Sequence, residues 1–238
     1  MWIKICANTT LRDALRAAEA GADAVGFVFA PSPRRVAPHQ AAAIMPELPY
    51  DLTQVGVFQT HDFEEIAATV RTAGLHGIQL HGDPDLALAE KLRAEFGESM
   101  FVIQTLHWSV DRDPAASEET LLDEYRAVCH QRLVDAVLLD ARTATASGGT
   151  GRTIDWARVR DLLAAEPLGL RIILAGGLNP DNVAEAIRTL RPWGVDVASG
   201  VETSPGNKDS ALVQAFVRNA RNAFAAIESP AVPVERTL

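Results

Sequence analysis

Short apolar runs alternate with longer amphipathic stretches along almost the whole chain. The apolar runs are rich in Val, Ile, Leu and Phe and predict strands at Trp2–Cys6, Ala24–Phe29, Gln54–Phe58, Gly77–Leu80, Phe101–Thr105, Ala136–Asp140, Arg171–Ala175 and Val195–Ser199. Stretches rich in Ala, Leu, Arg and Glu follow these runs and predict helices at Leu11–Ala20, Pro38–Met45, Asp62–Ala73, Asp85–Phe96, Ser117–Gln131, Asp155–Ala164, Asn179–Thr189 and Asp209–Ile227. Strands that are each followed by a helix pair in parallel. The pattern therefore predicts an α/β fold, a single (β/α)8 TIM barrel with eight parallel strands.

A short phrase recurs where a helix is followed by a strand. It reads Ala-Gly-Ala-Asp-Ala-Val at 20–25, Leu-Val-Asp-Ala-Val at 133–137 and Trp-Gly-Val-Asp-Val at 193–197. Such a repeat favours a closed barrel over an open doubly wound sheet, whose G-x-G-x-x-G motif does not follow the first strand. We expect one barrel domain over residues 1–228 and a flexible C-terminal tail at 229–238, which contains two prolines. His107–Glu119, a long polar connection, is expected to run over the surface.

Composition and charge exclude several classes of protein. A length of 238 residues suits a single barrel, and a net charge of −9 argues against nucleic acid or an anionic membrane as the main partner. The N-terminus has no signal-peptide pattern, and no apolar run approaches the roughly 20 residues that a membrane span needs. Two cysteines, Cys6 and Cys129, are too few for a disulfide framework. We therefore expect a cytoplasmic enzyme.

Reacting residues in such a barrel lie where the strands end, at their C-terminal side. Lys4 and Cys6 in the first strand are two residues apart, so both side chains point to the same side. Cys6 could act as a base or nucleophile there, although a lone cysteine at such a position is more often a small core residue. Cys129, in a predicted outer helix, is interpreted as a core residue.

Two further strand ends carry candidate binding groups. Arg34 follows Pro31 and Pro33 in a stiff loop after the second strand. An arginine in such a loop could bind a carboxylate or a phosphate, and the alternative is a solvated arginine on the surface. His81 follows the fourth strand and could contact a ligand or hydrogen-bond to backbone.

The sixth strand ends in Leu-Leu-Asp, and this places Asp140 where burial would raise its pKa and let it act as an acid near neutrality. A buried salt bridge is the alternative. The loop at 147–152 that follows is glycine-rich, which is typical of loops that approach a ligand closely.

The last two strands are followed by glycine-containing turns, Gly176-Gly177 and Ser199-Gly200. Barrels of this class often bind phosphate between these two loops on backbone N–H groups. Asp196 lies early in the last strand, and it either points inward, paired with a group such as Lys4, or lies in the turn at the opposite end.

The ordered set of motifs resembles the phosphoribosylanthranilate isomerase family over roughly residues 3–222. The matching segments are Lys4-Ile5-Cys6, 21–29, Ser32-Pro33-Arg34, Gln79-Leu80-His81-Gly82, Leu138-Leu139-Asp140, 148–151, Asp155-Trp156, 176–180 and 196–202. The resemblance implies an Amadori rearrangement of N-(5-phosphoribosyl)anthranilate, a step of tryptophan biosynthesis, without a metal or organic cofactor.

The resemblance also assigns roles to individual residues. It implies that Asp140 protonates the ring oxygen, that Cys6 removes the C2′ proton, and that Arg34 binds the anthranilate carboxylate. The substrate phosphate would lie on the backbone of Gly176, Gly177, Ser199 and Gly200, and His81 and Asp196 would be further substrate-binding residues. One position departs from the family, which usually has glycine where this chain has Ala7. A positive φ at that position would strain Ala7 and shift the thiol.

Three other functions suit the same fold but match these residues less well. A Schiff-base aldolase needs a lysine at a strand end, and none of Lys4, Lys91 and Lys208 ends strand 5, 6 or 7. A barrel isomerase acting on an aminoimidazole ribonucleotide, alone or as a second substrate, is expected to carry Asp at the position of Cys6. A ligand-binding barrel without catalysis would not need Cys6, Asp140 and Arg34 together. We expect a monomer, with a homodimer as the alternative.

Overall fold

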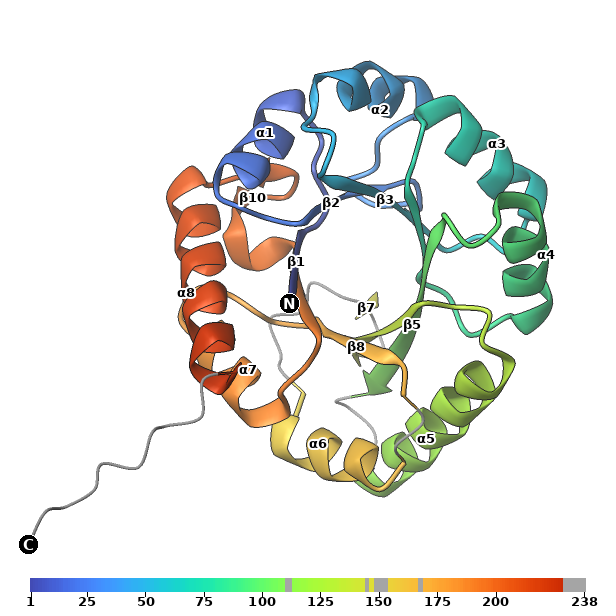
Figure 1. The fold of residues 1–238 in the computed structure, drawn as a ribbon, viewed down its shortest axis with the longest axis vertical. Coiled ribbons are helices and arrows are strands. Elements are labelled where there is room, and N and C mark those ends of the chain that lie inside the picture. The colour runs from blue at the N-terminus through green and yellow to red at the C-terminus, as the bar shows by residue number, and fades with distance from the viewer. Residues whose placement is uncertain (110–112, 144–145, 148–153, 167–168, 229–238) are drawn as a thin grey trace, which may run out of the picture.

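The computed structural model describes residues 1–109, 113–143, 146–147, 154–166 and 169–228. Its parallel barrel strands are β1 (Trp2–Ile5), β2 (Ala24–Val28), β3 (Thr53–Phe58), β4 (Gly77–Leu80), β5 (Phe101–Ser109), β6 (Ala136–Thr143), β8 (Arg171–Leu174) and β9 (Gly194–Val197). They follow the order β5-β4-β3-β2-β1-β9-β8-β6, and β5 pairs with β6 to close the ring (Figure 1). A short strand β7 (Ala146–Ser147) adds antiparallel to β6. The predicted TIM barrel is confirmed.

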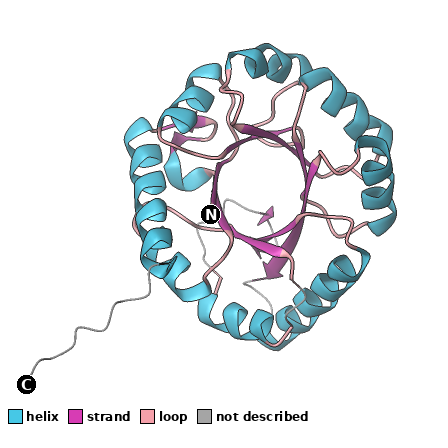
Figure 2. Cartoon of the chain, viewed as in Figure 1, coloured by secondary structure: helices cyan, strands magenta, loops and turns pink. Residues whose placement is uncertain are grey.

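An outer ring of helices surrounds the strands (Figure 2). These helices are α1 (Leu11–Glu19), α2 (Pro38–Ile44), α3 (Phe63–Ala73), α4 (Leu86–Phe96), α5 (Pro114–Gln131), α6 (Trp156–Ala164), α7 (Val183–Leu190) and α8 (Ser210–Glu228). Several begin at a residue whose side chain accepts a hydrogen bond from a first-turn N–H group, as do Thr10, Asp62, Asp85 and Asp155. These caps fix where the helices start and so limit the length of the loops above the strands.

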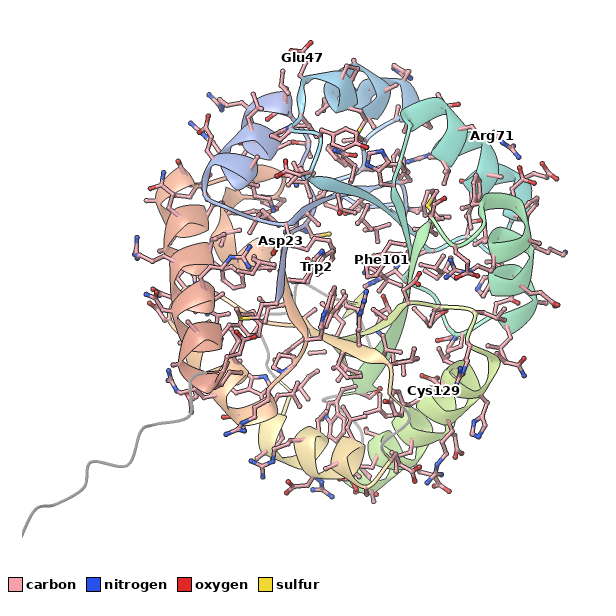
Figure 3. All side chains as sticks on the ribbon, in the orientation of Figure 1. Trp2, Asp23, Glu47, Arg71, Phe101 and Cys129 are labelled. Atoms are coloured by element: carbon pink, nitrogen blue, oxygen red, sulfur yellow. The ribbon has the colours of Figure 1, made fainter. Side chains whose placement is uncertain are left out.

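Aromatic rings fill the N-terminal end of the barrel. Trp2 stacks on Trp193 with ring centroids 5.5 Å apart, and Phe101 lies 5.8 Å from Trp2. In Figure 3, Trp2 and Phe101 are labelled on opposite sides of the strand ring. Because side chains occupy this end, a ligand can enter the barrel from the other end, where the strands finish.

The recurring Asp of the helix-to-strand phrase has a structural role at two of its three positions. Asp23 accepts a hydrogen bond from Ile3 N at 2.8 Å, and Asp135 accepts one from Val102 N at 2.7 Å. Each carboxylate thus satisfies a backbone donor of the neighbouring strand. Asp196 differs because β9 begins at Gly194, two residues before it, and its side chain points inward.

Two expected boundaries were wrong. The surface connection at His107–Glu119 is instead a continuation of β5 to Ser109 and the start of α5 at Pro114. His107 and Trp108 are buried there, and β5 stays paired with β6 as far as Ser109, so the strand continues through residues whose polar character predicted a loop. The predicted helix at Asn179–Thr189 starts at Val183, because the Asn179 side chain accepts hydrogen bonds from the N–H groups of the turn before it.

The predicted tail at 229–238 and the glycines at 148, 149 and 151 lie outside the described residues. No helix in the part of the chain that the structure describes is both long and apolar enough to cross a bilayer.

Candidate active site

A cavity of about 250 Å³ opens at the C-terminal ends of the barrel strands. We call it the rim cavity. Among its lining residues are nearly all the site residues expected from the sequence, namely Cys6, Arg34, His81, Asp140, Gly176, Gly177, Asp196 and Ser199. The exception, Gly200, lies directly behind, next to Ser199. Residues spread over most of the chain therefore meet at one place.

Cys6 follows β1 on the cavity floor and is 6% exposed. Its thiol fits against the neighbouring strand because residue 26 is glycine: a Cβ there would lie 2.6 Å from Sγ of Cys6. Burial raises the pKa of the Cys6 thiol, and the nearby Lys4 ammonium partly opposes this rise. The site thus holds a buried thiol at the cavity wall, whose ionisation is opposed by burial and favoured by the Lys4 ammonium and, to a smaller extent, by that of Lys208.

Lys4 and Asp196 form a buried ion pair beside Cys6. Lys4 Nζ lies 2.9 Å from Asp196 Oδ1, and the two side chains are 0% and 9% exposed. Burial opposes the charged form of Lys4, but Asp196 and Cys6 together raise its pKa above the ordinary value. Of the two expected placements for Asp196, the inward one paired with Lys4 is therefore confirmed, and the turn at the opposite end is not.

Asp140 lies on β6 in the same cavity and is 6% exposed. Burial and the charge of Asp196 raise the pKa of Asp140 to about 7, although the hydrogen bond from Ala141 N–H and the charge of Lys4 lower it. Gly176 makes room for this carboxyl group, since a Cβ there would lie 2.9 Å from Asp140 Oδ1. A carboxyl group with this pKa can donate a proton near neutral pH.

His81 lies over Asp140, with Nε2 3.9 Å from Asp140 Oδ2. Its ring is held from two sides: Gln79 Nε2 is 3.4 Å from Nδ1, and the ring of His107 packs edge-on at 5.0 Å. His107 Nε2 also lies 3.1 Å from the carbonyl oxygen of His81. The continuation of β5 that the sequence did not reveal is what places His107 there.

Arg34 reaches the cavity from the loop after β2, and its side chain meets Glu202. Arg34 Nε donates to both carboxylate oxygens of Glu202 at 3.0 Å, and Nη2 donates to Oε2 at 2.7 Å. Lys208 Nζ donates to Oε1 of the same carboxylate at 2.9 Å. Although burial favours its neutral form, Arg34 and Lys208 hold the pKa of Glu202 below its ordinary value.

Glu202 and Lys208 were not among the expected site residues. Glu202 belongs to the segment 196–202, one of those that carry the family resemblance, and Lys208 is one of three lysines in the chain. Glu202 pairs with Arg34 across 168 positions of the chain, and Lys208 reaches Glu202 through a short hairpin, so no local pattern indicated either contact.

Two loops meet on the side of the cavity where β8 and β9 end. Gly176 and Gly177 have φ of +79° and +69°, and Asn182 Nδ2 donates to the carbonyl oxygen of Gly177 at 2.9 Å. Gly200 packs so closely that a Cβ would lie 1.9 Å from the carbonyl oxygen of Leu178. The glycines therefore allow a close approach of backbone groups that a phosphate can use.

Ala7 has φ of +62°, in the left-handed region that favours glycine, and it lines the cavity beside Cys6. The backbone at Ala7 is therefore strained, which the sequence alone could not decide.

Among the described residues, no group of three or more His, Cys, Asp or Glu side chains is placed to hold a metal ion.

Ala7→Gly is expected to stabilise the protein by about 1 kcal/mol, because glycine adopts this backbone conformation without a Cβ clash. For a domain of this size the gain corresponds to a rise in Tm of about 2–4 °C. Urea unfolding followed by circular dichroism measures it. Ala18→Gly, inside helix α1, is the matched control and should lower stability by a similar amount. An Ala7→Gly protein that is less stable than wild type would contradict the strain.

Comparisons with known proteins identify a family. The family model described as N-(5′-phosphoribosyl)anthranilate (PRA) isomerase matches residues 3–219. The isomerase of that name from Pelobacter propionicus is 43% identical over 222 residues, which cover 92% of this chain and 95% of that protein.

Solved structures agree with this match. The crystal structure of phosphoribosylanthranilate isomerase from Thermotoga maritima has a TM-score of 0.78 and 37% identity, covering 93% of this chain and 99% of that one. A second isomerase structure, in complex with reduced 1-(o-carboxyphenylamino)-1-deoxyribulose 5-phosphate, has a TM-score of 0.75 and 34% identity over the same shares. The chain therefore belongs to the phosphoribosylanthranilate isomerase family, the isomerases that act on phosphoribosylanthranilate in tryptophan biosynthesis.

Proposed function

We propose that this chain converts N-(5-phosphoribosyl)anthranilate to 1-(2-carboxyphenylamino)-1-deoxyribulose 5-phosphate by an Amadori rearrangement, with Asp140 as acid and Cys6 as base. The observation that carries this proposal is that both groups line one cavity between an arginine and a glycine-lined loop pair. The reaction moves protons within one molecule, so a positioned acid and base suffice. We expect no metal or organic cofactor.

Asp140 acts first. Its carboxyl group protonates the furanose ring oxygen, the bond from C1′ to that oxygen breaks, and the anilino nitrogen lone pair forms the iminium double bond to C1′. A pKa of about 7 leaves roughly half of the Asp140 groups protonated at neutral pH. An ordinary aspartate would be almost fully ionised and unable to deliver this proton.

Cys6 acts second. Its thiolate removes the proton from C2′, and the C–H electrons form the C1′–C2′ double bond of an enolamine while the iminium nitrogen becomes neutral. The enolamine then tautomerises to the ketone. The iminium charge acidifies the C2′ proton, so a thiolate is basic enough, and Lys4 beside Cys6 favours that thiolate.

The two ends of the substrate have complementary groups in the cavity. Arg34 would bind the anthranilate carboxylate, and the backbone of Gly176, Gly177, Ser199 and Gly200 would bind the phosphate. The relative solved with reduced 1-(o-carboxyphenylamino)-1-deoxyribulose 5-phosphate holds a ligand that carries the same carboxylate and phosphate. We further propose that His81 contacts the substrate near Asp140, whereas Asp196 acts through Lys4 and Asp140 at the cavity wall.

The test of the acid and base replaces each group by one of similar size that cannot transfer the proton. Turnover is followed as the loss of anthranilate-type fluorescence from freshly generated phosphoribosylanthranilate. Activity retained in both Cys6→Ser and Asp140→Asn would remove both residues from the chemistry. Proteins that bind the substrate yet do not turn it over would support the proposal.

Arg34→Lys should weaken transition-state binding of the natural substrate by about 10- to 100-fold in kcat/KM, because lysine keeps the charge but loses the planar donor pair. A substrate analogue without the carboxylate should respond little to the same change. Steady-state kinetics on both compounds measure the difference. Equal losses for the two would show that Arg34 does not bind the carboxylate.

A monomer remains our prediction for the assembly of this chain. The large hydrophobic side chains that are exposed in the described residues are Met1, Tyr50 and Leu212, which is little apolar surface for a dimer interface. The isomerase from Thermotoga maritima is dimeric, however, and the solved monomers of it were generated from that dimer, so a homodimer is the alternative for this chain.

A further inference from the structure

We propose that Glu202 and Lys208 are positioning residues that determine recognition of the substrate carboxylate. Glu202 holds Arg34 by one edge of its guanidinium group and leaves the other edge for the ligand. Lys208 offsets the charge of Glu202, so that Arg34 still attracts an anion. This inference rests on the proposed function of Arg34. Neither residue is the acid or the base of the steps above, although the Lys208 ammonium also favours the ionised form of Cys6.

Of the three side chains, only that of Arg34 is partly exposed. The Arg34 side chain is 21% exposed, the Glu202 side chain 3% and the Lys208 side chain 0%. Arg34 lines the rim cavity, whereas Glu202 and Lys208 lie behind it. A ligand can therefore contact Arg34, and the other two act on the ligand through Arg34.

The donors of Arg34 divide between two partners. A guanidinium group has five N–H donors in a rigid planar arrangement. Glu202 accepts from Nε and from Nη2, which form one edge of the group. One Nη1 donor and the second Nη2 donor form the other edge, and a planar carboxylate matches that edge bidentately. Glu202 thus orients Arg34 without occupying the edge that a carboxylate would use.

Charge explains the need for Lys208. Arg34 and Glu202 alone would form a neutral pair, and an incoming carboxylate would meet the negative Glu202 behind the arginine. Lys208 Nζ lies 2.9 Å from Glu202 Oε1, so the three groups together carry one positive charge. Attraction between charges is stronger at such a water-poor site than in bulk water.

The hairpin after β9 delivers both residues. It consists of β10 (Glu202–Ser204) and β11 (Asn207–Lys208), in which Glu202 lies directly opposite Lys208. Gly206, with φ of +82°, allows the tight turn, and Lys208 Nζ also donates to the carbonyl oxygen of Ala198 at 3.0 Å. The hairpin is thus attached to the end of β9 and holds the pair beneath Arg34.

The experiment compares two inhibitors: the reduced product analogue, and its phenylamino counterpart that lacks the carboxylate. Lys208→Met should weaken binding of the first on the order of 10-fold and leave the second almost unchanged. Lys91→Met, on the exposed side of α4, is the matched control and should change neither. A purely structural role for Lys208 would weaken both inhibitors alike and overturn the proposal.

For Glu202→Gln, the direction of the change in affinity tests the proposal. Removing its negative charge alone would tighten binding of the carboxylate inhibitor, whereas loss of the position of Arg34 would weaken it, and we expect weakening. Tighter binding would overturn the positioning role, and this variant decides the question if Lys208→Met does not fold. Arg34→Met separates the two levels: if it weakens both inhibitors equally, the proposed role of Arg34 fails first. If it is selective for the carboxylate while Lys208→Met is not, the present inference alone fails.

Discussion

Cys6→Ser is expected to lower kcat/KM for phosphoribosylanthranilate by roughly 10³- to 10⁴-fold while leaving the fold intact. A serine hydroxyl has a far higher pKa than a thiol and cannot take the C2′ proton at neutral pH. The smaller oxygen fits the space that Gly26 leaves for Sγ, so no new clash arises. Affinity for the reduced product analogue should therefore be retained, and fluorescence-monitored turnover measures the loss.

Cys129 provides the control for this prediction. It is buried in α5, on the outer ring of the barrel in Figure 3. Cys129→Ala should keep full activity and the same sensitivity to thiol alkylation as wild type. Because burial raises the pKa of Cys6, alkylation should be slow at neutral pH, accelerate as the pH rises, and be prevented by bound product analogue. An active Cys6→Ser enzyme would place the base elsewhere, with His81 as the first candidate.

The barrel was predictable from the sequence because each strand is a short apolar run bounded by a helix. The ends of strands were harder to predict where polar residues are buried. The sequence pattern predicts that the fifth strand ends at Thr105, but β5 continues to Ser109 and includes the buried His107. The burial of His107 depends on its pairing with Asp140 of β6 and on packing against His81. Tertiary contacts of this kind leave no periodic signal in the local sequence.

It was predictable that the expected site residues would lie close together, because a barrel places its strand ends at one rim. The interactions between those residues were not predictable from the sequence. The pairing of Asp196 with Lys4 was one of two open alternatives, and the strain at Ala7 required a backbone angle. Glu202 and Lys208 depend on the register of a short hairpin, which sets their position behind Arg34.

Asp140→Asn is expected to lower kcat by roughly 10²- to 10⁴-fold, since an amide cannot deliver a proton to the ring oxygen. Asparagine has nearly the shape of aspartate, so it fits the space beside Gly176. Retention of more than about a tenth of wild-type kcat would exclude the acid role, given the usual size of general acid catalysis. The pH dependence gives a second, sharper criterion.

The active form needs Asp140 protonated and Cys6 ionised, yet the pKa of Asp140 is about 7 and burial raises that of Cys6 above its ordinary range. Below pH 7 both groups hold protons, and kcat/KM rises with pH as more thiolate forms. Between the two pKa values each gain of thiolate is cancelled by the loss of protonated Asp140, so the wild-type profile is flat. Above the pKa of Cys6 it falls.

The bend near pH 7 in wild-type kcat/KM therefore reports the acid, although it lies on the rising side of the profile. Asp140→Asn has no such group, so its residual activity should keep rising through pH 7 and level off only where Cys6 ionises. The profile of kcat/KM from pH 5 to the alkaline limit of stability measures this change. A bend that persists near pH 7 in Asp140→Asn would assign it to another residue, and Asp140 would then lose the acid role even if its replacement slowed turnover.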